Sequence, residues 1–198
     1  YPKEELHLMM HPHHTPFGDL FFRYTTELGG PFIYLLLLFI LFRNFAAGTY
    51  LISSNIAGLI ISETLKHIFA APRPKLFFEN FHPDLILPSV PGYELWLTNS
   101  FPSGHTISAF ALFFGLTLIS KSRWLNVLFF ILAALTAYSR VYLSMHFAID
   151  ILAGSAIGVF CAWIFYPTFL KLHSKWNKRS LIQVIKENNN SKDTLNPK

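Results

Sequence analysis

Residues 31–42 read PFIYLLLLFILF, a stretch without a charged residue and without a polar face. It lies in a longer uncharged run, residues 28–42, between Glu27 and Arg43. A helix on the surface of a soluble protein carries polar side chains along one side. The stretch therefore favours a helix inside a lipid bilayer over the alternative, a soluble all-helical bundle with a very apolar core.

Four further uncharged runs give the chain its fold class. They cover residues 44–62, 106–120, 124–139 and 151–170. A membrane-spanning helix needs roughly 20 residues, and flanking polar residues and snorkelling Lys or Arg side chains extend the shorter runs. The chain has 198 residues, of which 52% are hydrophobic and 14% charged. We expect one all-α domain, a polytopic membrane helical bundle with about five transmembrane helices.

The N-terminal residues 1–28 differ from these runs. Phe17, Leu20 and Tyr24 recur at three- and four-residue spacing, which predicts an amphipathic helix at the membrane surface. The chain begins with Tyr1 and not with Met. We therefore expect that a preceding segment is missing, and the helix count would be six if that segment contains a first transmembrane helix.

The same segment is rich in histidine. The histidines are His7, His11, His13 and His14. Such a cluster could bind a metal ion, but Pro12 and the irregular context argue against a defined site. We expect a solvated or interfacial segment without a metal.

Two polar regions flank the apolar runs. Pro72 and Pro74 cannot continue a helix, so the second membrane helix should end just before them. Residues 72–101 are expected to form a long polar loop, and a loop of this length in a compact protein is usually functional. After a membrane domain of residues 1–170, residues 171–198 form a basic tail that we expect to be increasingly disordered.

The basic residues orient the bundle through the positive-inside rule. If five helices alternate, then Arg43, the pair Lys121 and Arg123, and the basic tail fall on one side, which we expect to be cytoplasmic. The loop of residues 72–101 and the other polar blocks then fall together on the opposite face. We expect a protein of the inner (cytoplasmic) membrane with these blocks facing the periplasm or the exterior.

Three fixed positive charges stand in the polar blocks. Lys66 and Arg73 bracket the end of the second apolar helix, and Arg140 follows the fourth run. Arginine presents a planar fork to phosphate oxygens, while lysine acts as a point charge. Around a phosphorus atom they would do the electrostatic work that magnesium does in other phosphoryl-transfer enzymes. Snorkelling explains each cation separately, but not why all of them accompany two histidines.

The block Pro102-Ser103-Gly104-His105 precedes an apolar run and marks a helix N-terminus. Free backbone N–H groups and the positive end of the helix dipole suit a phosphate there. Gly104 lets the backbone approach the phosphate oxygens, and Ser103 can donate its hydroxyl proton. His105 could protonate a leaving oxygen. By itself the block is also an ordinary helix start.

His146 and Asp150 are four residues apart, so both face the same way at the start of the last apolar helix. A carboxylate that holds one imidazole nitrogen fixes the tautomer and leaves the other nitrogen free to attack. It also stabilises the cation that forms when histidine accepts a phosphoryl group. Taken alone, the pair favours an ordinary structural contact at a helix start over catalysis.

Composition bears on cofactors and partners. The sequence has no dense Asp/Glu or Cys/His cluster that would hold a divalent metal, so we expect neither a metal nor another cofactor. Glu63 is expected to be a local ion-pair partner of Lys66 or His67. The net charge of +5 fits contact with anionic lipids, and no basic patch supports a nucleic-acid partner. The sequence leaves the oligomeric state open.

Together the three blocks resemble the signature of the type 2 phosphatidate phosphatase family, which also includes bacterial acid phosphatases and vanadium haloperoxidases. The family pattern is Lys-x6-Arg-Pro, Pro-Ser-Gly-His, then Ser-Arg-x5-His-x3-Asp, and the chain matches every position in order. The matching residues are Lys66, Arg73, Pro74, Pro102, Ser103, Gly104, His105, Ser139, Arg140, His146 and Asp150.

The resemblance implies a role for each of these side chains. His146 would be the nucleophile and form a phosphohistidine, Asp150 would orient it, and His105 would be the general acid and then help to activate water. The phosphate would be held by Lys66, Arg73, Ser103, Gly104 and Arg140. The membrane branch of the family typically has six helices, which agrees with a missing first helix or with a shorter variant of the fold.

Three functions compete at this point. The first is a metal-independent membrane lipid phosphatase that acts on undecaprenyl diphosphate, phosphatidylglycerophosphate, phosphatidate or lipid A, among which the sequence does not choose. The second is a vanadate-dependent haloperoxidase, which the apolar runs disfavour. The third is a non-enzymatic membrane protein, which the complete signature disfavours.

Overall fold

The structure, a computed structural model, describes residues 2–11, 14–85, 87, 89–176 and 179–195. Within these residues the chain consists of helices joined by turns and loops, without a strand. The all-α prediction is therefore confirmed. Tyr1, Pro12 and His13, on which some predictions rest, lie outside the described residues.

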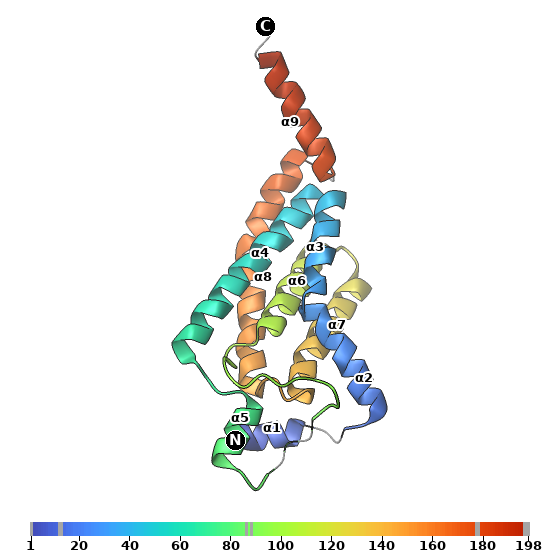
Figure 1. Cartoon of the computed structure of the whole chain (residues 1–198). Coiled ribbons are helices and arrows are strands. Elements are labelled where there is room, and N and C mark those ends of the chain that lie inside the picture. The colour runs from blue at the N-terminus through green and yellow to red at the C-terminus, as the bar shows by residue number, and fades with distance from the viewer. Residues whose placement is uncertain (1, 12–13, 86, 88, 177–178, 196–198) are drawn as a thin grey trace.

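A bundle of apolar helices forms the body of the molecule, and each corresponds to one predicted run (Figure 1). Its helices are α3 (Phe32–Arg43), α4 (Phe45–Phe69), α6 (Gly104–Ile119), α7 (Arg123–Tyr142) and α8 (Ala148–Trp176). The central helix is α6, which packs against α4, α7 and α8.

Helix lengths test the expected number of membrane crossings only in part. In the described part of the chain, the segment Phe45–Phe81 and the helices α7 and α8 are long and apolar enough to cross a membrane. A fourth candidate is a pair, Pro16–Gly29 with α3, that is bent by 47°. Helix α6 is apolar but has only 16 residues. The count of five crossings stays a prediction.

Glycines bring α6 and α8 into backbone contact. A methyl group on Gly158 would lie 2.6 Å from the carbonyl oxygen of Ile107, and one on Gly154 would lie 2.9 Å from that of Ser103. Small residues of this kind let membrane helices approach closely. The contact places the first turn of α8 against the start of α6, where the backbone N–H of Ser103 donates to the carbonyl of Asp150 at 3.1 Å.

The polar blocks gather at one end of the bundle, the lower end in Figure 1. The end of α7 and the starts of α6 and α8 meet there, and the short helix α5 (Pro74–Phe81) lies beside them. The predicted loop of residues 72–101 is thus wrong over α5. Prolines suggested a loop, but Pro74 occupies the first turn of the helix, where proline is well tolerated.

The basic tail lies at the opposite end of the bundle. The backbone N–H of Phe45 donates to the carbonyl of Arg179 at 2.9 Å, beside Arg43 at the junction of α3 and α4. Helix α9 (Leu181–Leu195) follows, so the expected disorder is wrong across these residues. Its apolar residues include Val184, which is 4% exposed. The polar composition of the tail predicted disorder, but packing of apolar residues such as Val184 stabilises a helix there.

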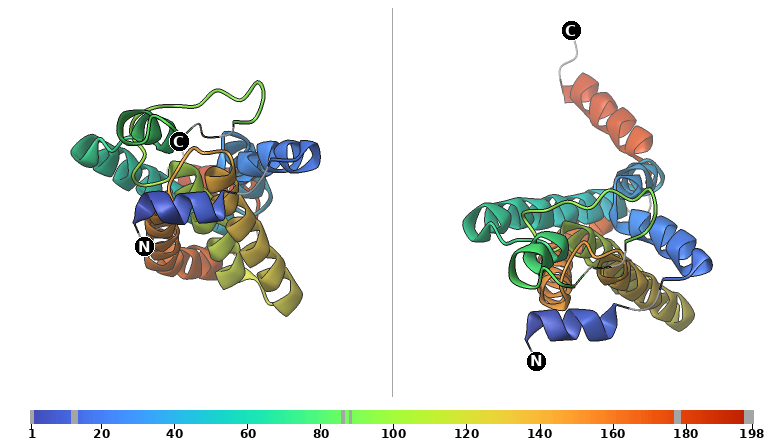
Figure 2. Two further views of the ribbon diagram at one scale, coloured as in Figure 1. Left: turned by 90° about the horizontal axis from the view of Figure 1, so that it is seen from below. Right: turned by 60° about the horizontal axis from the view of Figure 1, so that its bottom comes forward.

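The N-terminal segment contains three pieces: α1 (Lys3–Met10), α2 (Pro16–Thr25) and the 3-10 turn η1 (Thr26–Gly29). Helix α2 leaves Phe17, Leu20 and Tyr24 largely exposed, as an apolar face at a membrane surface requires. Helix α1 lies across the site end of the bundle (Figure 2). The sequence did not predict it.

Helix α1 is anchored by His7, which is completely buried. Its ring lies 5.3 Å from the ring of Phe147 and 5.9 Å from that of Phe78, and neither ring nitrogen has a hydrogen-bond partner. The expected solvated segment is therefore wrong at this residue. Burial, with His11 adding to the effect, lowers the pKa of His7 from 6.5 to about 4.

We expect the docking of α1 to weaken in mild acid. The pKa of His7 is lower in the docked state than in the free segment, so docking is strongest above pH 6.5 and weakens as the pH falls toward 4, by roughly 3 kcal/mol in all. A spin label at position 9 (Met9→Cys) would report the change as increased mobility in electron paramagnetic resonance spectra between pH 7.5 and 4.5. His7→Leu should reduce the pH dependence, and part of it should remain because burial also lowers the pKa of His11 to about 4. An unchanged pH profile in this variant would refute the assignment.

Candidate active site

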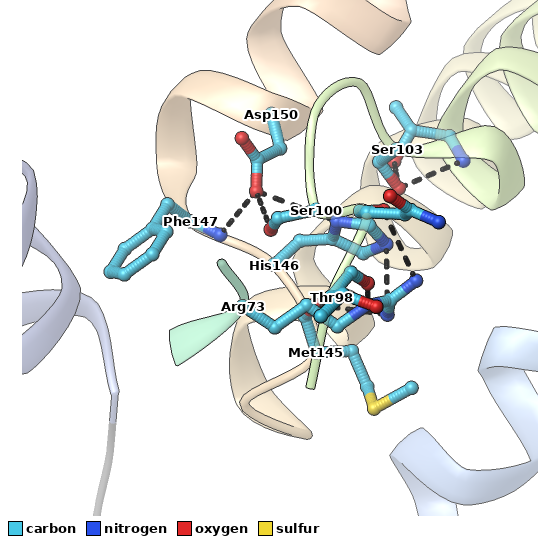
Figure 3. A network of polar contacts seen from close by, with 10 residues as sticks. Arg73, Thr98, Ser100, Ser103, Met145, His146, Phe147 and Asp150 are labelled. Carbon is cyan, nitrogen blue, oxygen red and sulfur yellow. Dashed lines mark hydrogen bonds and ion pairs between the residues drawn. The ribbon is translucent and has the colours of Figure 1, made fainter. Parts of the chain in front are cut away.

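The three polar blocks form one cluster, which Figure 3 shows from close by. Arg73 comes from the start of α5, and residues 98–103 from the segment before α6. His146 lies in the turn between α7 and α8, and Asp150 lies in the first turn of α8. Arg73, Ser103, Arg140, His146 and Asp150 are each at most 3% exposed. Buried charged and polar groups need hydrogen-bond partners, and backbone N–H and carbonyl groups nearby supply many of them.

Arg73 is held by backbone carbonyls. Its Nε donates to the carbonyl of Thr98 at 2.8 Å, and its Nη1 donates to that of Met145 at 3.1 Å. The guanidinium carbon also lies 5.3 Å from the ring centroid of Trp96. These contacts aim Nη1 at His146, whose Nε2 is 3.5 Å away (Figure 3). A fixed positive charge therefore stands beside the predicted nucleophile.

The end of α7 explains the spacing between Arg140 and His146. Ser144 has a φ of 49°, and the N–H groups of Ser144 and Met145 donate to the carbonyls of Val141 and Arg140 at 2.9 Å each. This is the Schellman arrangement that ends many helices. The N–H of His146 then donates to the same Arg140 carbonyl at 3.2 Å. The helix cap itself folds His146 back toward Arg140.

Asp150 caps the next helix while it faces the histidine. Its Oδ2 accepts from the backbone N–H of Phe147 at 2.9 Å, as an acidic third residue does in a capping box. The same oxygen accepts from the hydroxyl of Ser100 at 2.5 Å. It lies 3.4 Å from His146 Nδ1, in ion-pair range but not aligned for a hydrogen bond. The carboxylate position is thus fixed from two sides.

The protonation state of His146 follows from its surroundings. Burial lowers the pKa of His146 below its ordinary value, Arg73 and Arg140 lower it further, and Asp150 opposes them. The imidazole is therefore neutral at neutral pH. With Asp150 facing Nδ1, the lone pair at Nε2 faces Arg73 and is available to an electrophile.

The start of α6 brings Lys66 into the cluster. A methyl group on Gly104 would lie 3.5 Å from Lys66 Nζ and 3.4 Å from Ser62 Oγ. Ser103 caps the helix, because its Oγ accepts from the backbone N–H of Thr106 at 3.5 Å, and it also accepts from the hydroxyl of Thr106 at 3.0 Å. Lys66 Nζ also lies 2.7 Å from Glu63 Oε1, which confirms the predicted local ion pair. The lysine charge thus stands at the positive end of a helix dipole.

Arg140 approaches the cluster from α7. Its Nη1 donates to the hydroxyls of Thr26 at 2.6 Å and Tyr93 at 3.2 Å, while its buried Nε has no partner in the described part of the chain. His105 is partly buried and interacts electrostatically with Arg140 and His146. The structure therefore brings every predicted site residue into one region, with an N–H donor still unused.

Sequence reasoning missed three side chains of this site. Ser100 donates to Asp150, whereas Thr26 and Tyr93 hold Arg140. Ser100 lies only two residues before the block that begins at Pro102, and this closeness is a sequence signal that it belongs to the site. Thr26 and Tyr93 reach the site through the tertiary fold, and no local pattern marks them.

The site carries positive charge and few groups suited to metals. Among the described residues, no three His, Cys, Asp or Glu side chains converge in a way that could hold a metal ion. Three cations, a helix N-terminus and unpartnered polar atoms surround a neutral imidazole. This arrangement can bind a phosphate group and present a nitrogen nucleophile to its phosphorus.

Known proteins share parts of this sequence. The lipid A 4′-phosphatase of Porphyromonas gingivalis is 31% identical over 134 residues, which cover 67% of this chain and 54% of that protein. The undecaprenyl-diphosphatase of Sulfolobus acidocaldarius is 29% identical over 152 residues, covering 76% of this chain and 66% of that protein. The chain thus spans only about half the length of the first of these relatives.

Solved structures share the fold. Aquifex aeolicus LpxE aligns with a TM-score of 0.68 and 28% identity, over 82% of this chain and 93% of that one. A transmembrane PAP2-type phosphatidylglycerolphosphate phosphatase of Bacillus subtilis aligns with a TM-score of 0.66 and 21% identity, over 86% and 85% of the two chains. With its apolar helices, the chain is a multi-pass membrane protein. The sequence profile of the PAP2 superfamily matches residues 47–174, and the chain therefore belongs to that superfamily.

Proposed function

We propose that the protein is a metal-independent phosphatase that hydrolyses a phosphate monoester or diphosphate of a membrane lipid. The observation that carries the proposal is the neutral imidazole of His146, placed between Asp150 and Arg73 in a cluster of three cations. The named activities of the relatives, on lipid A and undecaprenyl diphosphate, are consistent with this class of substrate.

Binding of the phosphate would use the groups already in place. Arg73, Arg140 and Lys66 neutralise the phosphoryl oxygens, and the hydroxyl of Ser103 and the backbone N–H groups of the first turn of α6 donate to them. Gly104 keeps that turn accessible because it has no side chain. These donors also stabilise the negative charge that the equatorial oxygens carry in the transition state.

The first chemical step would be attack by Nε2 of His146 on phosphorus. A bond forms between Nε2 and phosphorus, the bond from phosphorus to the lipid oxygen breaks, and His105 gives its proton to that oxygen. Asp150 faces Nδ1 and stabilises the positive charge of the phosphohistidine. The 3.4 Å contact between them is of the kind that tightens when substrate binds.

The second step would return the enzyme to its starting state. His105, now neutral, accepts a proton from a water molecule as that water attacks the phosphohistidine. The bond from phosphorus to Nε2 breaks, inorganic phosphate is released, and His105 is again protonated. The same residue thus acts first as an acid and then as a base.

The lipid portion of the substrate would remain among apolar side chains. A hollow of about 250 Å³ adjoins Asp150 and Ser100 and is lined by Phe69, Phe101 and Ile149 among others. Phe69 and Ile149 are more than half exposed, so the hollow opens at the apolar surface of the bundle. The headgroup could then reach the site while the lipid tail stays in the bilayer.

We further propose the orientation that the positive-inside rule suggests, with the site facing the periplasm or the exterior and residues 171–198 in the cytoplasm. Arg43 and the tail lie at one end of the bundle and the site lies at the other, which is the separation that this orientation needs. The membrane would be the inner (cytoplasmic) membrane.

The test is phosphate release by the purified protein in detergent, with EDTA present. We expect turnover of at least one of undecaprenyl diphosphate, phosphatidylglycerophosphate, phosphatidate and lipid A, and inhibition by vanadate, which resembles the pentacoordinate phosphorus. The rates across these four lipids would identify the preferred class. A complete dependence on added magnesium, or no turnover of any of the four, would overturn the proposal.

A further inference from the structure

The turn η1 is part of the site although it lies outside residues 47–174, the segment that matches the PAP2 superfamily. It packs against both α6 and α7. A methyl group on Gly29 would collide with the backbone carbonyl of His105, so only a glycine permits this approach. Thr26 in the same turn is the residue that accepts from Arg140 at 2.6 Å. The segment therefore touches two predicted site residues.

Glu27 lies between these two contacts. From a methyl position on Gly30, Glu27 Oε2 would be 2.8 Å away and His105 Nε2 would be 3.3 Å away. The two atoms are therefore within about 6 Å of each other, a span that one water molecule or a small rotation of the carboxylate closes. Glu27 is partly buried and also interacts electrostatically with Arg140. A carboxylate thus lies near the imidazole nitrogen Nε2.

His105 needs such a charge if it is the general acid. The titratable or charged groups that face it are Lys66 on α4, Arg73 before α5, Arg140 on α7, His146 before α8, and Glu27 on η1. The first three are cations, and a nearby positive charge disfavours the protonated imidazole. Asp150 is engaged by Ser100 and by Phe147 beside His146. Glu27 is placed to offset the cations at His105.

We propose that Glu27 is a positioning residue for His105: its carboxylate orients the ring through Nε2 and stabilises the protonated form that donates to the leaving oxygen. The inference rests on the proposed function, because it assigns a partner to the general acid of that reaction. It adds to the phosphatase site a residue that the sequence blocks do not contain.

The experiment compares two leaving groups in detergent. A lipid phosphate monoester releases an alkoxide and needs a proton, whereas p-nitrophenyl phosphate releases a phenolate that needs almost none. We expect Glu27→Gln to lower kcat/KM about tenfold or more for the lipid and less than about twofold for p-nitrophenyl phosphate. The alkaline limb of the lipid pH profile should also move to lower pH, because the protonated acid is less stable. Glu79→Gln, on an exposed residue of α5, is the matched control.

His105→Ala is measured in parallel, and it separates this inference from the proposed function. If His105→Ala shows the leaving-group selectivity but Glu27→Gln lowers both rates equally or neither, then Glu27 has no role in proton donation and the inference is wrong while the phosphatase mechanism stands. If His105→Ala lacks the selectivity as well, then His105 is not the general acid, and both its role and that of Glu27 are refuted.

Discussion

Replacing His146 with alanine is expected to lower kcat for a lipid phosphate by at least about three orders of magnitude. The reaction as proposed passes through a covalent bond to Nε2, and the remaining cations and donors can bind the phosphate but cannot form that bond. The measurement is the steady-state rate of phosphate release over a range of lipid concentrations, which gives kcat and KM separately. KM should change little, because Arg73, Arg140 and Lys66 remain in place.

Two controls make the result interpretable. His173→Ala, at the far end of α8, tests the effect of losing an imidazole away from the site and should retain activity. Rapid alkaline quenching with a substrate labelled in its phosphoryl group should trap a protein-bound phosphate in the wild type and none in His146→Ala. Residual activity above about 5% of wild type in a folded His146→Ala protein would contradict the role of His146.

Asp150→Asn is expected to lower kcat by about two to three orders of magnitude, by analogy with loss of the carboxylate partner of a catalytic histidine. The amide keeps the size of the side chain but loses the charge that stabilises the phosphohistidine cation. The amide has only one acceptor oxygen. In the wild type the Ser100 hydroxyl and the Phe147 N–H both donate to the same carboxylate oxygen, so in the variant the amide oxygen would take that place. An amide nitrogen facing Nδ1 would favour the wrong tautomer.

The readout for Asp150→Asn is the separation of kcat from KM, with thermal unfolding measured alongside because Asp150 also caps α8. We expect kcat to fall while KM stays within about threefold, since the phosphate is held by other residues. Asp84→Asn, on an exposed position after α5, serves as the matched control. A kcat within a factor of about three of wild type would show that the carboxylate has no role in the chemistry.

The bundle and the three polar blocks of the candidate site were predictable because each is encoded over short stretches of sequence. The uncharged runs show where apolar helices form, and the caps at Ser103 and Asp150 use residues within one turn of the helix start. The spacing of Arg140 and His146 also has a local cause, the cap that ends α7. These features need no knowledge of the tertiary fold.

The remaining features depend on tertiary packing. Thr26 and Tyr93 contact Arg140 across separations of 114 and 47 residues, and nothing in their own neighbourhood indicates this role. His7 was expected in a solvated or interfacial segment, but its side chain is buried against Phe78 and Phe147. Composition predicted a loop and a disordered tail where α5 and α9 form, because the packing of single apolar residues outweighed prolines and polar neighbours.

The backbone contact between α6 and α8 has a mechanical consequence for an enzyme in a bilayer. Transmembrane helices tilt to match the thickness of the surrounding lipid. Because the backbones of α6 and α8 are in close contact at Gly154 and Gly158, we expect the two helices to tilt together. His146, the proposed nucleophile, lies at the start of α8 and Ser103 at the start of α6, so we expect the distance between these two residues to be preserved. We therefore expect the rate of the proposed reaction to depend little on the thickness of the membrane.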